Sequence, residues 1–415
     1  MKRPVHVSGI GVVSVFGTSA GEFRDGLLSG RSGVTRVTGF DVGGCRTVLA
    51  GEIQRFEPTA WITPMKLRRL DRTGVYAVAA TRRAFEDASV PPAADGDDTT
   101  GVLLGTWTAG GQSTQQFLDA LFRSGPSGAP ALLFDSTVGN SAAGLTGLEF
   151  KLRGPNITLS HKEASGLGAI VGAVDLLREE RAATMIAGGV DAVFETFFKA
   201  HDRFRVMSPD ASAGAGTAPF DASRRGFVIG EGACVFRLTS CAAPAGHGEF
   251  LGVAASSAAV PVNAWPSCPE PLMRTMQLAM QDAGVEPRDV SVVYASANGT
   301  SLDDVEARAI EELFAGASPV VTSVKGALGE CGAAGSASCA AAFLCGEVGQ
   351  APPIAGLTQP STAASGLRLA RETTPLAGPI ALVNSFASGG ALFSAVLRVA
   401  PRRAGVAAPP AARPS

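Results

Sequence analysis

One segment of this chain has the length of a helix and almost no polar side chains. Residues Ser165–Arg178 read SGLGAIVGAVDLLR, so a helix here is apolar on every side and not only along one face. A helix of that kind is buried in the interior of a fold. The segments on either side, residues 157–160 and 184–190, have the short apolar pattern of strands. The sequence therefore predicts a helix that is buried all round and flanked in the chain by strands.

The alternation of strands and helices extends over the whole chain. The predicted helices occupy residues 69–88, 112–122, 165–178 and 271–283, and the predicted strands residues 101–105, 157–160, 184–190, 290–295, 320–324, 380–384 and 391–399. A further helix begins with Asp303, Asp304 and Glu306, which suit the positive end of a helix dipole. Such alternation indicates an α/β fold whose internal sheets are covered on both faces.

The pattern repeats once, which predicts two related halves. The second half begins near Glu249, so we expect an N-terminal half at residues 1–248 and a C-terminal half at residues 249–400. Residues 401–415 are rich in Pro, Ala and Arg, and we expect this tail to be disordered.

The charge and cysteine content exclude several classes of function. The chain has 35 Lys and Arg against 37 Asp and Glu, so we expect no nucleic-acid partner and no binding to an anionic membrane. No apolar stretch is long enough to span a bilayer, and the N-terminus lacks the pattern of a signal peptide. The seven cysteines show no metal-ligand spacing and are an odd number, which predicts reduced thiols and a cytoplasmic protein.

A glycine-rich segment near the N-terminus invites a dinucleotide-binding interpretation. Gly9-Ile10-Gly11 gives the first two glycines of that fingerprint, but Ser14 stands where the third belongs, and no helix follows at once. We interpret the segment as a close-packed turn between two strands. The sequence thus predicts no cofactor and no metal ion.

Three blocks of sequence, taken in order, resemble the β-ketoacyl synthase family. The blocks lie at residues 7–14 (VSGIGVVS), 219–233 (from Pro219-Phe220-Asp221 to GFVIGEGA) and 384–390 (Asn384-Ser385-Phe386, then Gly389-Gly390). The match runs in order from about residue 3 to residue 399. The resemblance implies a thiolase-like α/β fold in which two internally related halves form a layered αβαβα core.

The catalytic residues of that family are missing at the matching positions. The family places an acyl-carrying cysteine in Gly-Pro-x-x-Thr-x-x-Thr-Ala-Cys-x-Ser-Gly, and residues 154–166 here read GPNITLSHKEASG, which puts Glu163 at that position. Its two histidines are replaced by Asn298 and Glu330, and only the lysine, Lys325, is retained. None of the four histidines of the chain matches a catalytic position. The resemblance therefore implies that no catalytic set is intact.

The physical consequence of these replacements is loss of condensation by this chain alone. A cysteine at a helix N-terminus is activated as a thiolate, whereas a carboxylate is a poor acyl carrier. Asn298 still donates a hydrogen bond to a developing oxyanion, but an ionised Glu330 does not. We expect Glu163 to accept backbone N–H groups at the helix start, with Lys325 as its counter-ion, shared with Glu330. Three ionised groups give one net negative charge, which repels a malonyl carboxylate.

Inactive relatives that keep the whole fold are typified by the chain-length factor, or ketosynthase β subunit, of type II polyketide synthases. Such a subunit pairs with a catalytic ketosynthase as a heterodimer, receives substrate from an acyl carrier protein, and shapes a tunnel for the growing polyketide chain. The resemblance implies these three partners, and condensation only within the complex. Its nucleophile position usually holds glutamine, so Glu163 is a departure.

The resemblance also suggests residues for the tunnel and the interface. The helix after the glycine pair Gly110-Gly111 carries a polar stripe that is equally consistent with a solvated face or with tunnel lining. A bulky gate is usual in the glycine loop, and a serine there predicts that gating is absent. The candidates are Gln112, Gln115 and Asp119 on the stripe, Phe134 and Thr137 at the interface, and Phe386 and Ser388 in the glycine loop.

Two neighbouring features have alternative interpretations. Cys331 is a candidate displaced nucleophile, but it has no histidine base nearby in sequence and is more simply a buried thiol. His161 and Lys162 form either a new catalytic group or helix-entry residues that face the partner or a loop. Three hypotheses of function follow: a non-catalytic chain-length subunit, which we favour, an enzyme that uses Glu163 as acid or base on an acyl-carrier substrate, and a scaffold that only stabilises its partner.

Overall fold

The computed structural model describes residues 3–209, 217–242 and 246–401. The predicted disordered tail lies, from residue 402 onward, outside the described residues. The main sheet contains the strands β1 (Val5–Val13), β4 (Thr100–Gly105), β5 (Asn156–Leu159), β6 (Thr184–Asp191), β7 (Gly232–Thr239), β8 (Gly248–Ser257), β9 (Val292–Tyr294), β10 (Val320–Thr322), β13 (Ile380–Phe386) and β14 (Ala391–Val399). Two short ribbons pair β2 (Thr35–Arg36) with β3 (Leu49–Ala50) and β11 (Gln350–Ala351) with β12 (Thr374–Pro375).

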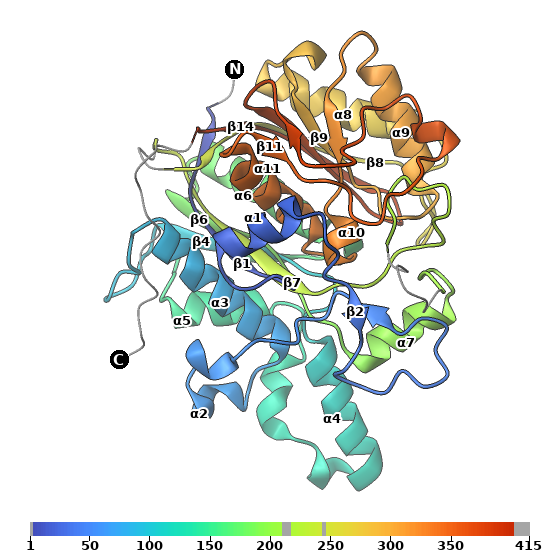
Figure 1. The fold of residues 1–415 in the computed structure, drawn as a ribbon. Coiled ribbons are helices and arrows are strands. Elements are labelled where there is room, and N and C mark those ends of the chain that lie inside the picture. Colours follow the sequence, from blue (N-terminus) through green and yellow to red (C-terminus); the bar gives the residue numbers. More distant parts are fainter. Residues whose placement is uncertain (1–2, 210–216, 243–245, 402–415) are drawn as a thin grey trace.

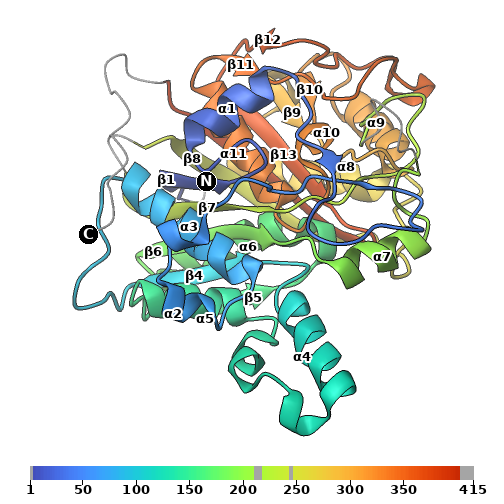
Figure 2. The same ribbon diagram turned by 60° about the horizontal axis from the view of Figure 1, so that its bottom comes forward.

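The helices lie on the outer faces of this sheet and between its two halves (Figure 1). They are α1 (Ala20–Leu28), α2 (Pro64–Leu67), α3 (Arg72–Asp87), α4 (Gly111–Ser124), α5 (Ser141–Glu149), α6 (Ser165–Arg178), α7 (Glu195–Arg203), α8 (Glu270–Ala283), α9 (Leu302–Leu313), α10 (Lys325–Leu328) and α11 (Ala334–Gly346). Short 3₁₀ turns at Pro126–Gly128 and Ala131–Ser136 follow α4. Together, α4 and these turns project from the body of the molecule (Figure 2).

The strand order repeats between the two parts of the sheet. The full order is β10-β9-β13-β14-β8-β1-β7-β6-β4-β5. Outward from the centre, β1-β7-β6-β4-β5 and β8-β14-β13-β9-β10 each run from the first strand to the fifth, fourth, second and third of their set. β1 and β8 join the sets through an antiparallel pairing of residues 5–7 with residues 248–250.

The arrangement of helices and strands in layers agrees with the prediction from the apolar segment at residues 165–178. Eleven of the fourteen residues of α6 are buried, and α6 packs against α11, β6 and β14 in the interior. On the outer faces, α3 covers β1 and β7, and α8 covers β8 and β14. The two halves of the main sheet thus enclose α6 and α11 (Figure 1), and the predicted layered α/β fold is confirmed.

The predicted turn at Gly9-Ile10-Gly11 is wrong, because β1 runs unbroken from Val5 to Val13. The glycines are required by close contact with α3. A Cβ atom on Gly11 would lie 1.7 Å from the carbonyl oxygen of Ala80, and one on Gly9 would lie 2.2 Å from that of Ala84. The glycines therefore allow a helix backbone to lie directly on the strand.

A half-buried histidine bridges two acids beside this strand. His247 Nε2 lies 2.6 Å from Asp87 Oδ2, and Nδ1 is hydrogen-bonded to Glu347. Burial lowers the pKa of His247, but the hydrogen bonds and charges of the two carboxylates outweigh burial and raise it to about 10. The imidazolium form is therefore favoured in the folded protein.

This bridge predicts a pH-dependent stability. Because the folded pKa lies above the unfolded value of about 6.5, the contribution is complete below pH 6.5 and is lost as the pH rises through 10. We expect His247→Gln to lower the free energy of unfolding by on the order of 2–4 kcal/mol at pH 6.5 and by much less at pH 10. Urea unfolding at both pH values measures this, with His6→Gln as the control. An equal loss at both values would contradict the prediction.

Candidate functional site

The turn between β5 and α6 places Glu163 inside the protein. After β5 ends at Leu159, Lys162 adopts a φ of +52°, in the left-handed region, and the helix begins at Ser165. The Ser165 hydroxyl holds this turn, because it lies 2.7 Å from the carbonyl oxygen of Lys162 and accepts from the backbone N–H of His161 at 2.9 Å. The Glu163 side chain that results is 1% exposed.

The Glu163 carboxylate is bonded to the loop that follows β13. The Ser388 hydroxyl donates to Oε1 at 2.9 Å and the Ser388 backbone N–H to Oε2 at 3.2 Å. Burial is the main cause that raises the pKa of Glu163 to about 7, and the nearby charge of Glu330 adds to it. Near neutral pH the carboxyl group of Glu163 therefore populates both protonation states. Its hydrogen bonds from Ser388 join the N-terminal half of the chain to the glycine loop of the C-terminal half.

A separate buried ion pair lies behind Glu163. Lys325 Nζ lies 2.8 Å from Glu330 Oε2 and also donates to the carbonyl oxygen of Ser296 at 2.8 Å. Asn298 Nδ2 donates to the same Glu330 oxygen at 2.7 Å. Both members of the ion pair are almost completely buried. The expectation that Lys325 is the counter-ion of Glu163 is therefore corrected, because Lys325 pairs with Glu330, five residues further along the chain.

The acidic residues at the start of α9 suit the helix dipole, but two of them, Asp303 and Glu306, are also buried carboxylates. The interpretation by the helix dipole alone does not include this. Asp303 accepts the backbone N–H groups of Asn298, Gly299 and Phe220, and Glu306 accepts that of Ser296. Burial raises the pKa of Asp303 to about 6 and that of Glu306 to about 7. Their i, i+3 spacing on a helix face with buried apolar residues is the signal that identifies them. They hold the loop that carries Asn298.

Asp191, at the end of β6, is a third acid that the sequence did not reveal. Its Oδ1 accepts from the backbone N–H groups of Trp107 and Thr108, at 2.8 and 2.9 Å, and from the hydroxyl of Thr106. Its Oδ2 accepts the backbone N–H of Gly332, two residues after Glu330. Asp191 thus joins the segment before α4, at Trp107 and Thr108, to the loop that follows Glu330.

Gln112 and Gln115, on the polar stripe suggested for the tunnel, are hydrogen-bonded to segments other than the one that carries Glu163. Gln115 accepts the backbone N–H of Thr196 at 3.0 Å, and Gln112 accepts that of Arg72 at 3.1 Å. A cavity of about 390 Å³ is lined by Gln115, Asp119 and Thr137 but not by Gln112 or Glu163. Whether this cavity holds an acyl chain stays a prediction.

The remaining candidates differ in exposure. Phe386 is completely buried, whereas the Phe134 side chain is 59% exposed and its ring centroid lies 5.7 Å from that of Phe117. Cys331 is buried, and burial raises the pKa of its thiol well above the usual range, which disfavours a nucleophilic thiolate. His161 packs against the ring of Phe393, and Lys162 contacts the glycine loop through Ser388.

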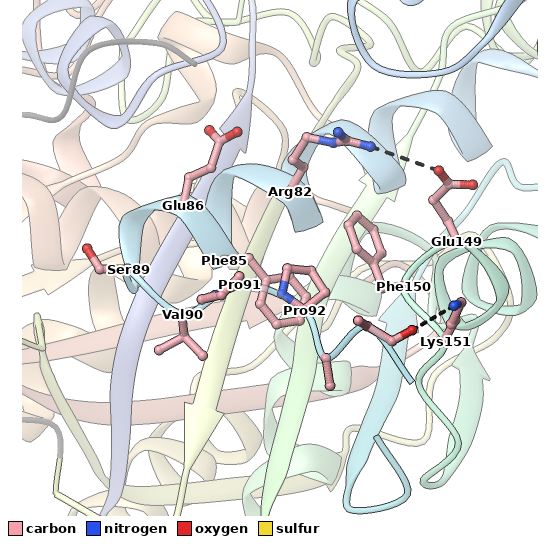
Figure 3. Close-up of a pocket in the computed structure, with 12 residues that line it drawn as sticks. Arg82, Phe85, Glu86, Ser89, Val90, Pro91, Pro92, Glu149, Phe150 and Lys151 are labelled. Carbon is pink, nitrogen blue, oxygen red and sulfur yellow. Dashed lines mark hydrogen bonds and ion pairs between the residues drawn. The ribbon is translucent and has the colours of Figure 1, made fainter. Parts of the chain in front are cut away.

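A second cavity, of about 620 Å³, lies between the C-terminal ends of α3 and α5 (Figure 3). Its lining is largely apolar and includes Phe85, Val90 and Phe150. Lys151 at its rim donates to the carbonyl oxygen of Ala94 at 2.7 Å, so that charge is already partnered. No degenerate catalytic position lines this cavity, so we place the candidate site at Glu163.

Within residues 3–209, 217–242 and 246–401, no cluster of three His, Cys, Asp or Glu side chains is arranged to bind a metal ion. In the same residues, no helix combines the length and the apolar character that crossing a membrane requires.

Comparison with known proteins gives consistent matches along the chain. Family models described as "Beta-ketoacyl synthase, N-terminal domain" and "Beta-ketoacyl synthase, C-terminal domain" match residues 2–241 and 247–358. Among curated proteins, 3-oxoacyl-[acyl-carrier-protein] synthase 2 of Rhizobium meliloti is 30% identical, over 95% of this chain and 99% of its own length. The protein of the same name from Synechocystis sp. is 29% identical, over 94% of this chain and 96% of its own.

Solved structures give the same result. A structure described as the ishigamide ketosynthase/chain length factor superposes with a TM-score of 0.88 at 28% identity, covering 96% of this chain and 100% of that one.

Proposed function

This chain belongs to the β-ketoacyl synthase family, with its thiolase-like fold, and from that premise we propose that it is the non-catalytic chain-length factor of a type II polyketide synthase. The observation that carries the proposal is the Glu163 carboxylate, buried at the nucleophile position and bonded to Ser388. A carboxylate that is hydrogen-bonded on both oxygens, and whose acyl derivative would be a reactive mixed anhydride, is a poor acyl carrier.

The other degenerate positions support the same conclusion. Condensation needs donors directed at the thioester oxygen as charge develops on it. Here Asn298 donates to Glu330, and Lys325 donates to Glu330 and Ser296. The groups at the positions of the catalytic donors thus bond to one another. These contacts support a structural role for the residues at these positions.

Two surfaces favour a partner of the same fold. Strand β5 ends the main sheet, and among the described residues no strand pairs with its outer edge. The opposite edge strand, β10, is bridged at Val321 by Leu369. An unpaired edge is a template for a strand from another chain. The projecting α4 region adds exposed apolar side chains, which mark interaction surfaces: Leu118, Phe122, Leu132, Phe134 and Val138.

Catalytic relatives favour a second candidate function. The curated relatives are named as 3-oxoacyl-[acyl-carrier-protein] synthases, so an acyl carrier protein is the expected source of substrate for the complex. A carboxyl group with a pKa of about 7 is also suited to general acid–base chemistry, which keeps an enzyme that uses Glu163 as the alternative. The third candidate function is a scaffold that stabilises its partner without shaping a tunnel.

Co-expression with candidate ketosynthases that have an intact Cys-His-His set tests the proposal. We expect a 1:1 complex that makes polyketide from malonyl-carrier protein, and no product from this chain alone. Turnover by the isolated chain that is lost in Glu163→Ala would instead support the enzyme.

Substitution in the cavity beside α4 separates a chain-length role from a scaffold role. In the complex, Gln115→Trp adds a large side chain at a cavity of about 390 Å³, so we expect shorter products with the complex intact. Mass spectrometry of the products measures this, with the exposed Gln116→Trp as the matched control on the same helix. Unchanged length in both variants would favour the scaffold.

A further inference from the structure

The cavity of about 620 Å³ between α3 and α5, the α3–α5 groove, is an apolar surface with an aromatic floor. The rings of Phe85 and Phe150 lie at its base with their centroids 5.5 Å apart, and Val90, Pro91 and Pro92 line it further out (Figure 3). Val90 is 40% exposed and both prolines are exposed, so the groove is open to solvent. Aromatic grooves of this kind bind proline-rich segments.

The last described residues of the chain approach one end of this groove. The backbone N–H of Ala400 donates to the carbonyl oxygen of His247 at 2.9 Å, and His247 Nε2 lies 2.6 Å from Asp87 Oδ2. Asp87 is the last residue of α3, and its neighbour Glu86 lines the groove. Residues 402–415 therefore follow from a point that only two side chains separate from the α3–α5 groove.

The sequence of residues 402–415, RRAGVAAPPAARPS, has the composition that such a groove accepts. Pro409 and Pro410 stand between alanines, and Val406 precedes them. Proline-rich segments lose little conformational entropy on binding, which favours their recognition by aromatic surfaces. At about 3.1 Å per residue, the chain between Pro401 and Pro409 reaches about 25 Å, which is enough to bring the two prolines into the groove.

The charges at this end of the groove suit the same segment. Residues 402–415 contain three arginines and no acidic residue. Five charged side chains lie between Ala400 and the groove: the carboxylates of Glu86, Asp87 and Glu347, and the cations of Arg83 and His247. The carboxylates outnumber the cations, so arginines that directly follow Pro401 enter a region of negative net charge.

We propose that the α3–α5 groove is a docking site for this chain's own residues 406–411 (VAAPPA), with Pro409 and Pro410 against the rings of Phe85 and Phe150. The composition that predicts disorder for the free tail is also that of segments which bind such grooves. A short tether gives an effective concentration on the order of 1 mM, so a peptide affinity of about 0.2 mM keeps about five-sixths of the grooves occupied. The inference does not depend on the chain-length role.

A thiol placed in the groove of the full chain reports on its occupant. In Val90→Cys, alkylation at position 90 by iodoacetamide is followed by peptide mass spectrometry, which separates it from the native cysteines. We expect Pro409→Asp/Pro410→Asp, added to Val90→Cys, to raise this rate about fivefold or more, because about one-sixth of the grooves are open with the native tail. Leu278→Cys, 37% exposed on α8, is the matched control and should react equally with either tail.

A free peptide and the protein concentration identify the occupant. A synthetic peptide of residues 401–415, at about 2 mM, should slow alkylation again in Val90→Cys/Pro409→Asp/Pro410→Asp, and the same peptide with both prolines replaced by Asp should not. With the native tail, the rate should be equal at about 1 µM and about 100 µM protein. Protection that grows with concentration would assign the groove to the tail of a second copy and overturn docking within one chain. A rate change below about twofold in Pro409→Asp/Pro410→Asp would overturn the proposal and leave the groove to another partner.

Discussion

Lys325→Met is expected to destabilise the protein by about 3–5 kcal/mol, because it leaves the carboxylate of Glu330 buried without its cation. Only Asn298 would remain as a side-chain donor to that carboxylate. The loss should shrink at low pH, where Glu330 is protonated. Urea unfolding, followed by circular dichroism at pH 7.5 and pH 5, measures both effects.

The double variant Lys325→Met/Glu330→Met is the control for this prediction. Replacing both members of a buried ion pair with apolar residues of similar volume is often neutral or stabilising. We therefore expect the double variant to recover at least half of the lost stability. A single-variant loss below about 1 kcal/mol would show that the pair is not buried as described.

Phe122→Asp combined with Phe134→Asp is expected to abolish the proposed complex with a catalytic ketosynthase. The two side chains are 81% and 59% exposed on the projecting α4 region. Placing two carboxylates in a desolvated interface costs about 2–4 kcal/mol for each central residue, which weakens the complex by about a hundredfold or more. Size-exclusion chromatography and sedimentation velocity of the co-expressed pair measure this loss.

Because both residues are exposed, the isolated chain should keep its melting temperature in this double variant. The matched control is Phe204→Asp, an equally exposed phenylalanine (68%) at the end of α7, away from the projecting region. An intact complex in the double variant would place the partner elsewhere. Dissociation by Phe204→Asp would instead extend the interface to α7.

Local sequence patterns predict α6 and most of the main-sheet strands, but they predict neither β7 and β8 nor the helices α1, α5 and α7. The bounds of α6, Ser165–Arg178, agree with those of the apolar segment. Because the helix is buried on almost every side, its apolar residues mark its whole length and not only one face. The turn at Gly9-Ile10-Gly11 was predicted wrongly because its cause is long-range: the glycines accommodate α3, about 70 residues later in the chain. A glycine that allows close packing and a glycine that forms a turn look alike in one sequence.

The pocket was less predictable than the fold. The register of the turn located Glu163 in a buried position, but its partner Ser388 lies 225 residues away, and spacing gives no information on such a contact. Likewise, the sequence offers two possible carboxylate partners for Lys325, namely Glu163 and Glu330. Only the path of the chain after α10 decides that Glu330 is its partner.

The hydrogen bonds among Lys325, Asn298 and Glu330 have an evolutionary consequence. A cysteine regained at position 163 by a single mutation would face a pocket whose other two replacements still satisfy one another. A histidine restored at position 330 alone would leave Lys325 buried without its carboxylate and would destabilise the intermediate. If the chain is the non-catalytic subunit proposed above, a return to catalysis therefore requires several changes at once.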